Sequence, residues 1–298
     1  MTAPDALVAW QEPGRTVLRQ AAEWHGWSPR WLPSRVSSAV RQRALRRYRA
    51  PILCQLPGGQ RFFADPSDLV QCLVGTTGGW EQMIFDAVGP LVPAGSTVLD
   101  VGAHVGYAAL RFGDWVGPTG RVVCFEPVPA HLAQLSRNLD VNGYDTRTTV
   151  VPMAVCDEAG DRPFFDAGGS NTGMSSLEAG SARAPSRRVR TVSIDGWLAQ
   201  AGLAEIALTK IDVEGAEALV LRGMVESLTA ARHRAVLVEL HPGVEPRIGQ
   251  RVAETFARVA GQPYALLDWR PSGRFVAIAE AEPANYLLAV RRDLVSLL

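Results

Sequence analysis

Seven short apolar runs follow Ser96, and they constrain the fold of this chain more than any other feature. In chain order they are TVLDVG, RVVCFEP, TTVVPMAV, IALTKID, AVLVEL, YALLDW and NYLLAV, mostly separated by segments of helical length. Short runs that are apolar throughout are typical of parallel strands covered on both faces, with the intervening segments as crossovers. The pattern predicts a doubly wound, Rossmann-like α/β domain of about 200 residues.

The composition argues against several classes of binding partner. The 298-residue chain balances 30 basic against 30 acidic residues, so no global charge draws it to nucleic acid or to an anionic membrane. No apolar stretch approaches the roughly 18 residues that span a bilayer, and the start MTAPDALVAW lacks the cationic segment of a secretory signal. The four cysteines lie far apart without a C-x-x-C pair, which argues against a disulfide framework or a thiolate metal site. We therefore expect a cytoplasmic protein with no nucleic-acid and no membrane partner.

The chain divides into two parts that differ in their pattern of apolar and charged residues. Residues 1–75 read as an N-terminal helical and hairpin extension, with four tryptophans, an arginine-rich segment at 41–49 and two short strands around a turn at 57–59. Residues 76–298 read as the main domain. The stretch 158–190, rich in Gly, Ser, Ala and Arg, interrupts its alternation and is either a substrate-side insertion or a mobile hairpin loop. The tryptophans of the extension offer an interface for a homo-oligomer.

The first two apolar runs end in residues suited to an adenosyl ligand. Ligands of an open α/β sheet bind beyond the carboxyl ends of its strands, where Asp100, Gly102 and Gly106 form the pattern D-x-G-x-x-x-G. The glycines permit a tight turn and a close backbone approach, but the G-x-G-x-x-G of a dinucleotide fold is missing. Glu126 ends the next run, where it can accept both hydroxyls of a ribose. This combination predicts S-adenosylmethionine, an adenosyl ligand without a pyrophosphate.

The segment KIDVEGAE brings three charges to the end of a strand. The alternation of a strand puts Lys210 and Asp212 on the same side, and Glu214 follows at the strand end. Lys210 is the single lysine among 30 basic residues. Lysine is a compact charge with three donors, whereas arginine is a wide, permanently charged fork, so its position here favours a role that arginine cannot fill. The next run, VLVELHP, places Glu239 and His241 on one side of the neighbouring strand.

The segments VLDVGAHVGYAAL, FEPVPAHLAQLSRNL and KIDVEGAEALVLRGM, followed by VELHP, resemble the FkbM family of class I methyltransferases over about residues 78–292. The resemblance implies a seven-stranded methyltransferase sheet and S-adenosylmethionine as the donor. It also implies an acceptor oxygen on a sugar, a polyketide or another secondary metabolite. In the family an acid at the position of Glu81 approaches the donor, and His104 of the donor loop stands where asparagine is common.

In methyl transfer to oxygen, the acceptor hydroxyl needs more activation than the donor does, because the donor is already a sulfonium. His241 is the predicted base, because the ordinary histidine pKa near 6.5 suits neutral pH. We expect Asp212 to orient the acceptor or the base, and Lys210 to stabilise a developing alkoxide.

Three alternatives to this mechanism are open. In a close variant, Asp212, Glu239 and His241 hold a Mg²⁺ ion that orients the acceptor and lowers the pKa of its hydroxyl. The chain could instead be a nicotinamide-dependent oxidoreductase, against which the missing G-x-G-x-x-G argues. It could also be a binding module that keeps the methyltransferase fold without catalysis.

Overall fold

A computed structural model describes residues 51–167, 171–178, 185–241, 248–259, 263–270, 272–278 and 285–298. The tryptophans and the arginine-rich segment of the predicted N-terminal extension lie outside these residues. The chain divides into two compact units. The first comprises Met1–Gln82, Asp140–Asn142 and Gly168–Thr172, and the second comprises Met83–Leu139, Gly143–Ala167 and Gly173–Leu298.

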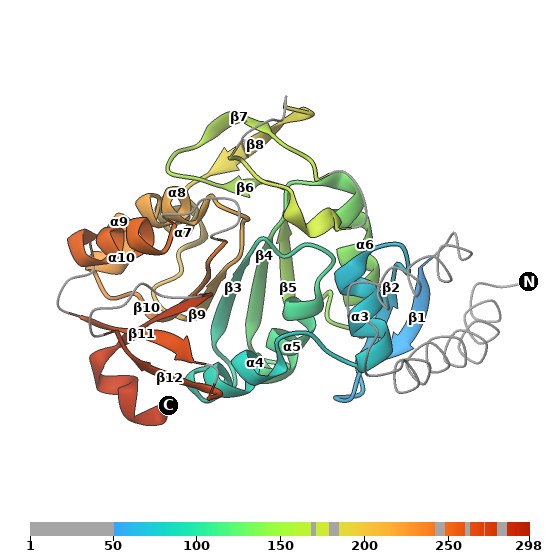
Figure 1. The fold of residues 1–298 in the computed structure, drawn as a ribbon, viewed down its shortest axis with the longest axis horizontal. Coiled ribbons are helices and arrows are strands. Elements are labelled where there is room, and N and C mark those ends of the chain that lie inside the picture. Colours follow the sequence, from blue (N-terminus) through green and yellow to red (C-terminus); the bar gives the residue numbers. More distant parts are fainter. Residues whose placement is uncertain are drawn as a thin grey trace, which may run out of the picture. The chain divides into compact units, whose positions relative to one another are not determined.

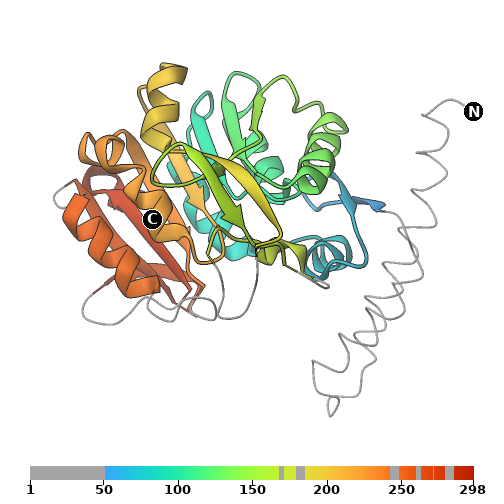
Figure 2. The same ribbon diagram turned by 90° about the horizontal axis from the view of Figure 1, so that it is seen from above.

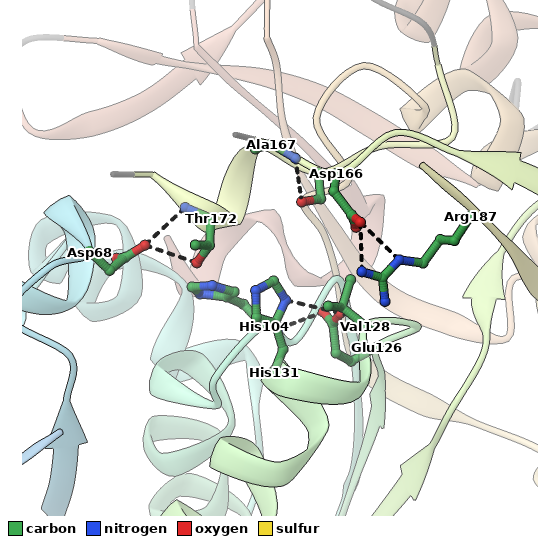
Figure 3. A network of polar contacts seen from close by, with 10 residues as sticks. Asp68, His104, Glu126, Val128, His131, Asp166, Ala167, Thr172 and Arg187 are labelled. Atoms are coloured by element: carbon green, nitrogen blue, oxygen red, sulfur yellow. Dashed lines mark hydrogen bonds and ion pairs between the residues drawn. The ribbon is translucent and has the colours of Figure 1, made fainter. Parts of the chain in front are cut away.

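The described part of the first unit is a hairpin followed by a helix. Strands β1 (Ile52–Gln55) and β2 (Arg61–Ala64) pair antiparallel around the predicted turn, in which Gly59 has a φ of 90°. Helix α3 (Leu69–Thr77) begins after Asp68, whose carboxylate accepts the backbone N–H of Gln71 as an N-cap. The same carboxylate accepts the N–H and the hydroxyl of Thr172, both at 2.9 Å, and so ties that later segment to the helix (Figure 3).

The second unit is an α/β structure (Figures 1 and 2). Its strands are β3 (Thr97–Val101), β4 (Arg121–Phe125), β5 (Thr148–Val151), β6 (Ala154–Val155), β7 (Gly160–Phe164), β8 (Arg187–Val192), β9 (Ile206–Ile211), β10 (His233–Glu239), β11 (Tyr264–Arg270), β12 (Arg274–Ala277) and β13 (Tyr286–Arg291). Its α-helices are α4 (Gln82–Val88), α5 (Tyr107–Val116), α6 (Pro129–Asp140), α7 (Ile194–Ala201), α8 (Glu217–Arg222), α9 (Val225–Thr229) and α10 (Ile248–Val259), and its 3₁₀ helices are η1 (Gly89–Leu91), η2 (Thr172–Met174) and η3 (Arg292–Leu297). The boundary helices α4, α6 and η2 each have one terminal residue in the first unit.

The large sheet confirms the predicted fold class and corrects its details. Its strand order is β12-β11-β13-β10-β9-β3-β4-β5, which gives eight strands in the described part of the chain rather than seven. The five strands from β10 to β5 run parallel, but β12 and β13 run antiparallel to their neighbours, so the sheet is mixed. The extra strand is β12, a hairpin partner of β11 whose Phe275 packs on Trp269 with ring centroids 4.9 Å apart. Its four residues are too short a run to stand out as a strand in the sequence.

A small sheet contains the two ends of the stretch that interrupts the predicted alternation. Strands β6, β8 and β7 form it in that order, with β7 and β8 paired antiparallel. It lies at one end of the large sheet and, seen from above, across the central strands (Figures 1 and 2). No helix in the described ranges is both long and apolar enough to span a bilayer.

Period-two alternation sorts the central strands into a core face and a polar face. Leu99, Val101 and Ile211 belong to the main apolar core, together with Val236 and Val238 of β10. The intervening residues therefore point to the opposite face. These are Asp100 on β3, Lys210 and Asp212 at the end of β9, and Glu239 and His241 at the end of β10. The backbone register makes Asp100 and Lys210 direct neighbours across adjacent strands.

The side chain of Asp195 supports the start of α9. Its two oxygens accept the backbone N–H groups of Glu226 and Ser227, at 2.8 and 3.0 Å. We expect Asp195→Ala to lower the free energy of unfolding by about 1–2 kcal/mol, because two helix-terminal donors lose their acceptor, and Asp195→Asn to cost less. Urea denaturation measures both variants. Identical midpoints for the wild type and Asp195→Ala would contradict this role.

Candidate active site

The loop after β3 is held against the end of β9. Gly102 has a φ of 84° and Gly106 a φ of 91°, a left-handed conformation that favours glycine. A Cβ atom added to Gly102 would lie 1.8 Å from the carbonyl oxygen of Asp212, so the position requires glycine for space as well. The predicted donor loop therefore packs directly on the backbone of the strand that carries Lys210 and Asp212.

Asp100 is a fully buried carboxylate, and neither of its oxygens has a hydrogen-bond partner in the structure. Burial raises the pKa of Asp100 to about 6, with Lys210 opposing the rise and Asp212 and Glu126 adding to it. A buried carboxylate without donors is costly. Its environment fits a ligand that brings a cation or N–H and O–H donors, as S-adenosylmethionine does.

Glu126, which follows β4, ties together the two loops of the predicted donor site (Figure 3). Its Oε2 accepts the backbone N–H of His104 at 2.9 Å, and its Oε1 accepts that of Val128 at 2.8 Å. His131, in the first turn of α6, lies with Nδ1 3.2 Å from the same Oε1, and its ring meets that of His104 edge to face with centroids 4.2 Å apart. No sequence motif singles out His131, because the packing of α6 sets its partner.

Lys210, Asp212 and His241 come together at the ends of β9 and β10, as their alternation predicts. The Lys210 Nζ lies 2.7 Å from Asp212 Oδ2, in a pair whose lysine is buried. The His241 Nε2 lies 3.7 Å from Asp212 Oδ1, 3.5 Å from Glu214 Oε2 and 3.7 Å from Glu239 Oε1. Glu214, with a φ of 55°, thus belongs to the cluster although it was not among the predicted catalytic or metal-binding residues.

Glu217 is the further residue that sequence analysis missed. Its side chain is fully buried at the start of α8, and its Oε1 lies 2.9 Å from His241 Nδ1 and accepts the backbone N–H of Gly215 at 3.0 Å. It is the last residue of the KIDVEGAE segment, but its partner His241 follows β10, and helices α8 and α9 separate the two in the sequence. Glu217 fixes the imidazole through Nδ1 and leaves Nε2 toward the other carboxylates.

The electrostatics of this cluster bear on the base role predicted for His241. Burial alone would lower the pKa of His241, but the hydrogen bond with Glu217 and the charges of Asp212 and Glu214 raise it to about 10. Burial raises the pKa of Glu214 to about 7, whereas Lys210 and His241 outweigh burial at Asp212 and lower its pKa. The ordinary pKa near 6.5 on which the predicted base role depends is therefore absent in the free cluster.

Part of the interrupting stretch packs against this end of the sheet. The buried Ser176 donates its hydroxyl to the carbonyl oxygen of Val213 at 3.1 Å, between Asp212 and Glu214 in the chain. Backbone hydrogen bonds in both directions join Ser176 to Phe165. Glu81, which the family resemblance connects with the donor, lies in the other compact unit just before α4, and its contact with the donor stays a prediction.

The fold and the site define the class, a Rossmann-like α/β protein whose predicted adenosyl donor site lies at the carboxyl ends of its central strands. The methyltransferase FkbM domain, as a family, matches residues 100–262, which is more than half of the chain. The chain therefore belongs to the FkbM methyltransferase family. This confirms the predicted family.

Two curated relatives carry methyltransferase names. The 2-O-methyltransferase NoeI of Sinorhizobium fredii is 31% identical over 149 residues, which cover 45% of this chain and 60% of NoeI. The hexuronic acid methyltransferase AglP of Haloferax volcanii is 28% identical over 150 residues, which cover 50% of this chain and 57% of AglP. The chain thus spans less than two thirds of the length of either relative. Among solved structures, a putative rRNA-methylase from Clostridium thermocellum is 11% identical with a TM-score of 0.46, over 70% of this chain and 94% of that one.

The buried charge of Asp100 is expected to reduce stability. Since its folded-state pKa of about 6 exceeds the unfolded value of 3.8, the stability present below about pH 4 is lost as the pH rises through 6. At pH 8, Asp100→Asn should raise the free energy of unfolding by about 1–3 kcal/mol, and this gain should vanish near pH 4. Urea denaturation at the two pH values tests the sign. A less stable variant at pH 8 would mean that Asp100 has a partner within the folded protein.

Proposed function

We propose that the protein transfers the methyl group of S-adenosylmethionine to a hydroxyl oxygen of a small molecule. The observation that carries the proposal is the register of β3 and β9. It makes Asp100, the unpartnered acid of the donor loop, the neighbour of Lys210, which in turn holds Asp212. Donor-side and acceptor-side groups thus share one face of the sheet, which favours a reaction between two bound molecules over simple binding.

On the donor side, the chain offers two acids and a close-packed loop. Asp100 suits a cationic or donor-bearing part of the ligand, and Glu126 keeps free lone pairs for ribose hydroxyls beside the N–H groups it already accepts. S-adenosylmethionine supplies an activated methyl group on a sulfonium. The contact of Gly102 with the Asp212 carbonyl keeps the donor loop next to the acceptor-side strand.

On the acceptor side, Asp212 is the proposed contact for the hydroxyl. Lys210 occupies Asp212 Oδ2, so Oδ1 is left to accept a hydrogen bond from the acceptor. In the transfer, the acceptor oxygen bonds to the methyl carbon, the carbon–sulfur bond breaks with its electrons on sulfur, and the hydroxyl proton leaves toward the carboxylates. Since His241 is held protonated in the free cluster, holding the reactants in line is the larger proposed contribution.

The acceptor we propose is a sugar hydroxyl, with a polyketide or another secondary metabolite as the wider class. The names of NoeI, a 2-O-methyltransferase, and of AglP, a hexuronic acid methyltransferase, support this choice. The segment around Ser176 is the proposed acceptor-side wall, because it is anchored at Val213 beside Asp212. We place the reaction in the cytoplasm, where the four buried thiols would stay reduced.

Donor binding is the first test of this function. Calorimetry should detect S-adenosylmethionine or S-adenosylhomocysteine binding to the full chain. Glu126→Gln should weaken binding by at least about 1 kcal/mol, because charge-assisted bonds to the ribose are lost. Glu226→Gln, an exposed glutamate on α9, is the matched control and should bind normally. Unchanged affinity in folded Glu126→Gln would refute the ribose assignment, and no binding by the wild type would refute the function.

The single lysine is the second test. Lys210→Arg keeps the charge but puts a wide guanidinium into a buried position fitted to an ammonium 2.7 Å from Asp212. We expect methyl transfer to an accepted sugar to fall by at least about tenfold while donor binding persists, since orientation of Asp212 is lost. Radiolabelled methyl transfer gives the rate, with the exposed Arg188→Lys as control. Normal turnover by Lys210→Arg would show that arginine can fill the role.

A further inference from the structure

We infer that Asp212, Glu214 and His241 form a binding site for a divalent metal ion. One ligand atom from each lies within 4.8 Å of the others. His241 Nε2 is 3.5 Å from Glu214 Oε2 and 3.7 Å from Asp212 Oδ1. Ligands about 2.0–2.3 Å from a shared ion lie about 3–4.4 Å from one another, so these side chains need little movement to hold one.

Two neighbours orient the ligands. Lys210 engages Asp212 through Oδ2 and leaves Oδ1, the oxygen nearer to His241, for the ion. Glu217 engages His241 through Nδ1 and leaves Nε2 for the ion, whose binding displaces the Nε2 proton. A carboxylate on the far nitrogen of a metal-binding histidine is a common outer contact that fixes the ring and raises its basicity.

The state of Glu217 is an independent sign that a positive charge belongs here. Its side chain is fully buried beside the three ligands, yet its Oε2 has no hydrogen-bond partner. Together with Glu239, four carboxylates lie within 3.7 Å of the His241 ring nitrogens. Gathering carboxylates in a half-buried site is unfavourable unless cations compensate them. Lys210 compensates Asp212 and a protonated His241 compensates Glu217 in part, and a divalent ion that replaces the Nε2 proton would add further positive charge.

The ligand set indicates which ions fit. Two carboxylates suit Mg²⁺ and Mn²⁺, and one imidazole adds tolerance for transition metals, so Mn²⁺ is the best single probe. This set differs from the one expected from the strand pattern, because Glu214 replaces Glu239 as the nearer carboxylate. The site itself does not depend on the proposed function. Its use does: the ion would bind the acceptor hydroxyl and lower the pKa of that hydroxyl.

The test measures Mn²⁺ binding without donor or acceptor. The full chain, stripped with a chelator, is titrated with Mn²⁺ and followed by electron paramagnetic resonance, with Mg²⁺ as competitor. We expect one Mn²⁺ per chain, and Glu214→Gln and His241→Gln should each raise its Kd by at least about tenfold. The control Glu226→Gln removes an exposed carboxylate away from the cluster and should bind as the wild type does.

The outcomes separate this inference from the proposed function. Circular dichroism and binding of S-adenosylhomocysteine show which variants are folded. Two variants, Glu214→Gln and His241→Gln, are used so that the test still works if one of them fails to fold. Absence of a one-to-one Mn²⁺ site in the wild type would overturn the inference, as would normal affinity in either folded variant. Methyl transfer could still occur in that case. Conversely, a one-to-one Mn²⁺ site that both variants lose would support the metal site even if no acceptor were methylated.

Discussion

The ion pair between Lys210 and Asp212 lies where the donor-side and acceptor-side halves of this site meet. The lysine is buried on the polar face of the central strands, with Asp100 as its neighbour on β3 and Asp212 at 2.7 Å. A compact ammonium can interact electrostatically with carboxylates on two adjacent strands in this small space, whereas a planar guanidinium would need more room. The burial of Asp100 is tolerable next to that charge, which opposes the rise in its pKa.

Two loops from distant parts of the chain attach to the same few backbone atoms after β9. The donor loop packs at Gly102 on the carbonyl of Asp212, and the later segment bonds through Ser176 to the carbonyl of Val213. Because both contacts use the main chain, the side chains of Asp212 and Glu214 stay available for chemistry. Both loops therefore help to fix the position of the strand end that carries Asp212 and Glu214.

The surroundings of His241 change what this histidine can do. An isolated imidazole would be a base near neutral pH, but Glu217 at Nδ1 and the carboxylates around Nε2 retain its proton in the free cluster. The same arrangement that disfavours a simple base favours a bound cation, because carboxylates and a ring nitrogen converge from two strand ends and one helix start. The proposed donor site is a separate group of residues, in which Glu126 contacts His104, Val128 and His131.

The sequence by itself determined the class of fold, the family, the donor loop and the shared face of the acceptor-side residues. The family follows from the resemblance of its motifs, and the others depend on local rules: strand alternation orients Lys210 with Asp212 and Glu239 with His241, and glycine spacing marks the turn after β3. Tertiary structure decided that Glu214 and Glu217 surround His241, that His131 meets Glu126, and that β12 adds an eighth strand to the described sheet. It also decided the pKa of His241. A side chain's partners and its pKa depend on groups that packing brings from other elements, and no spacing along one segment encodes them.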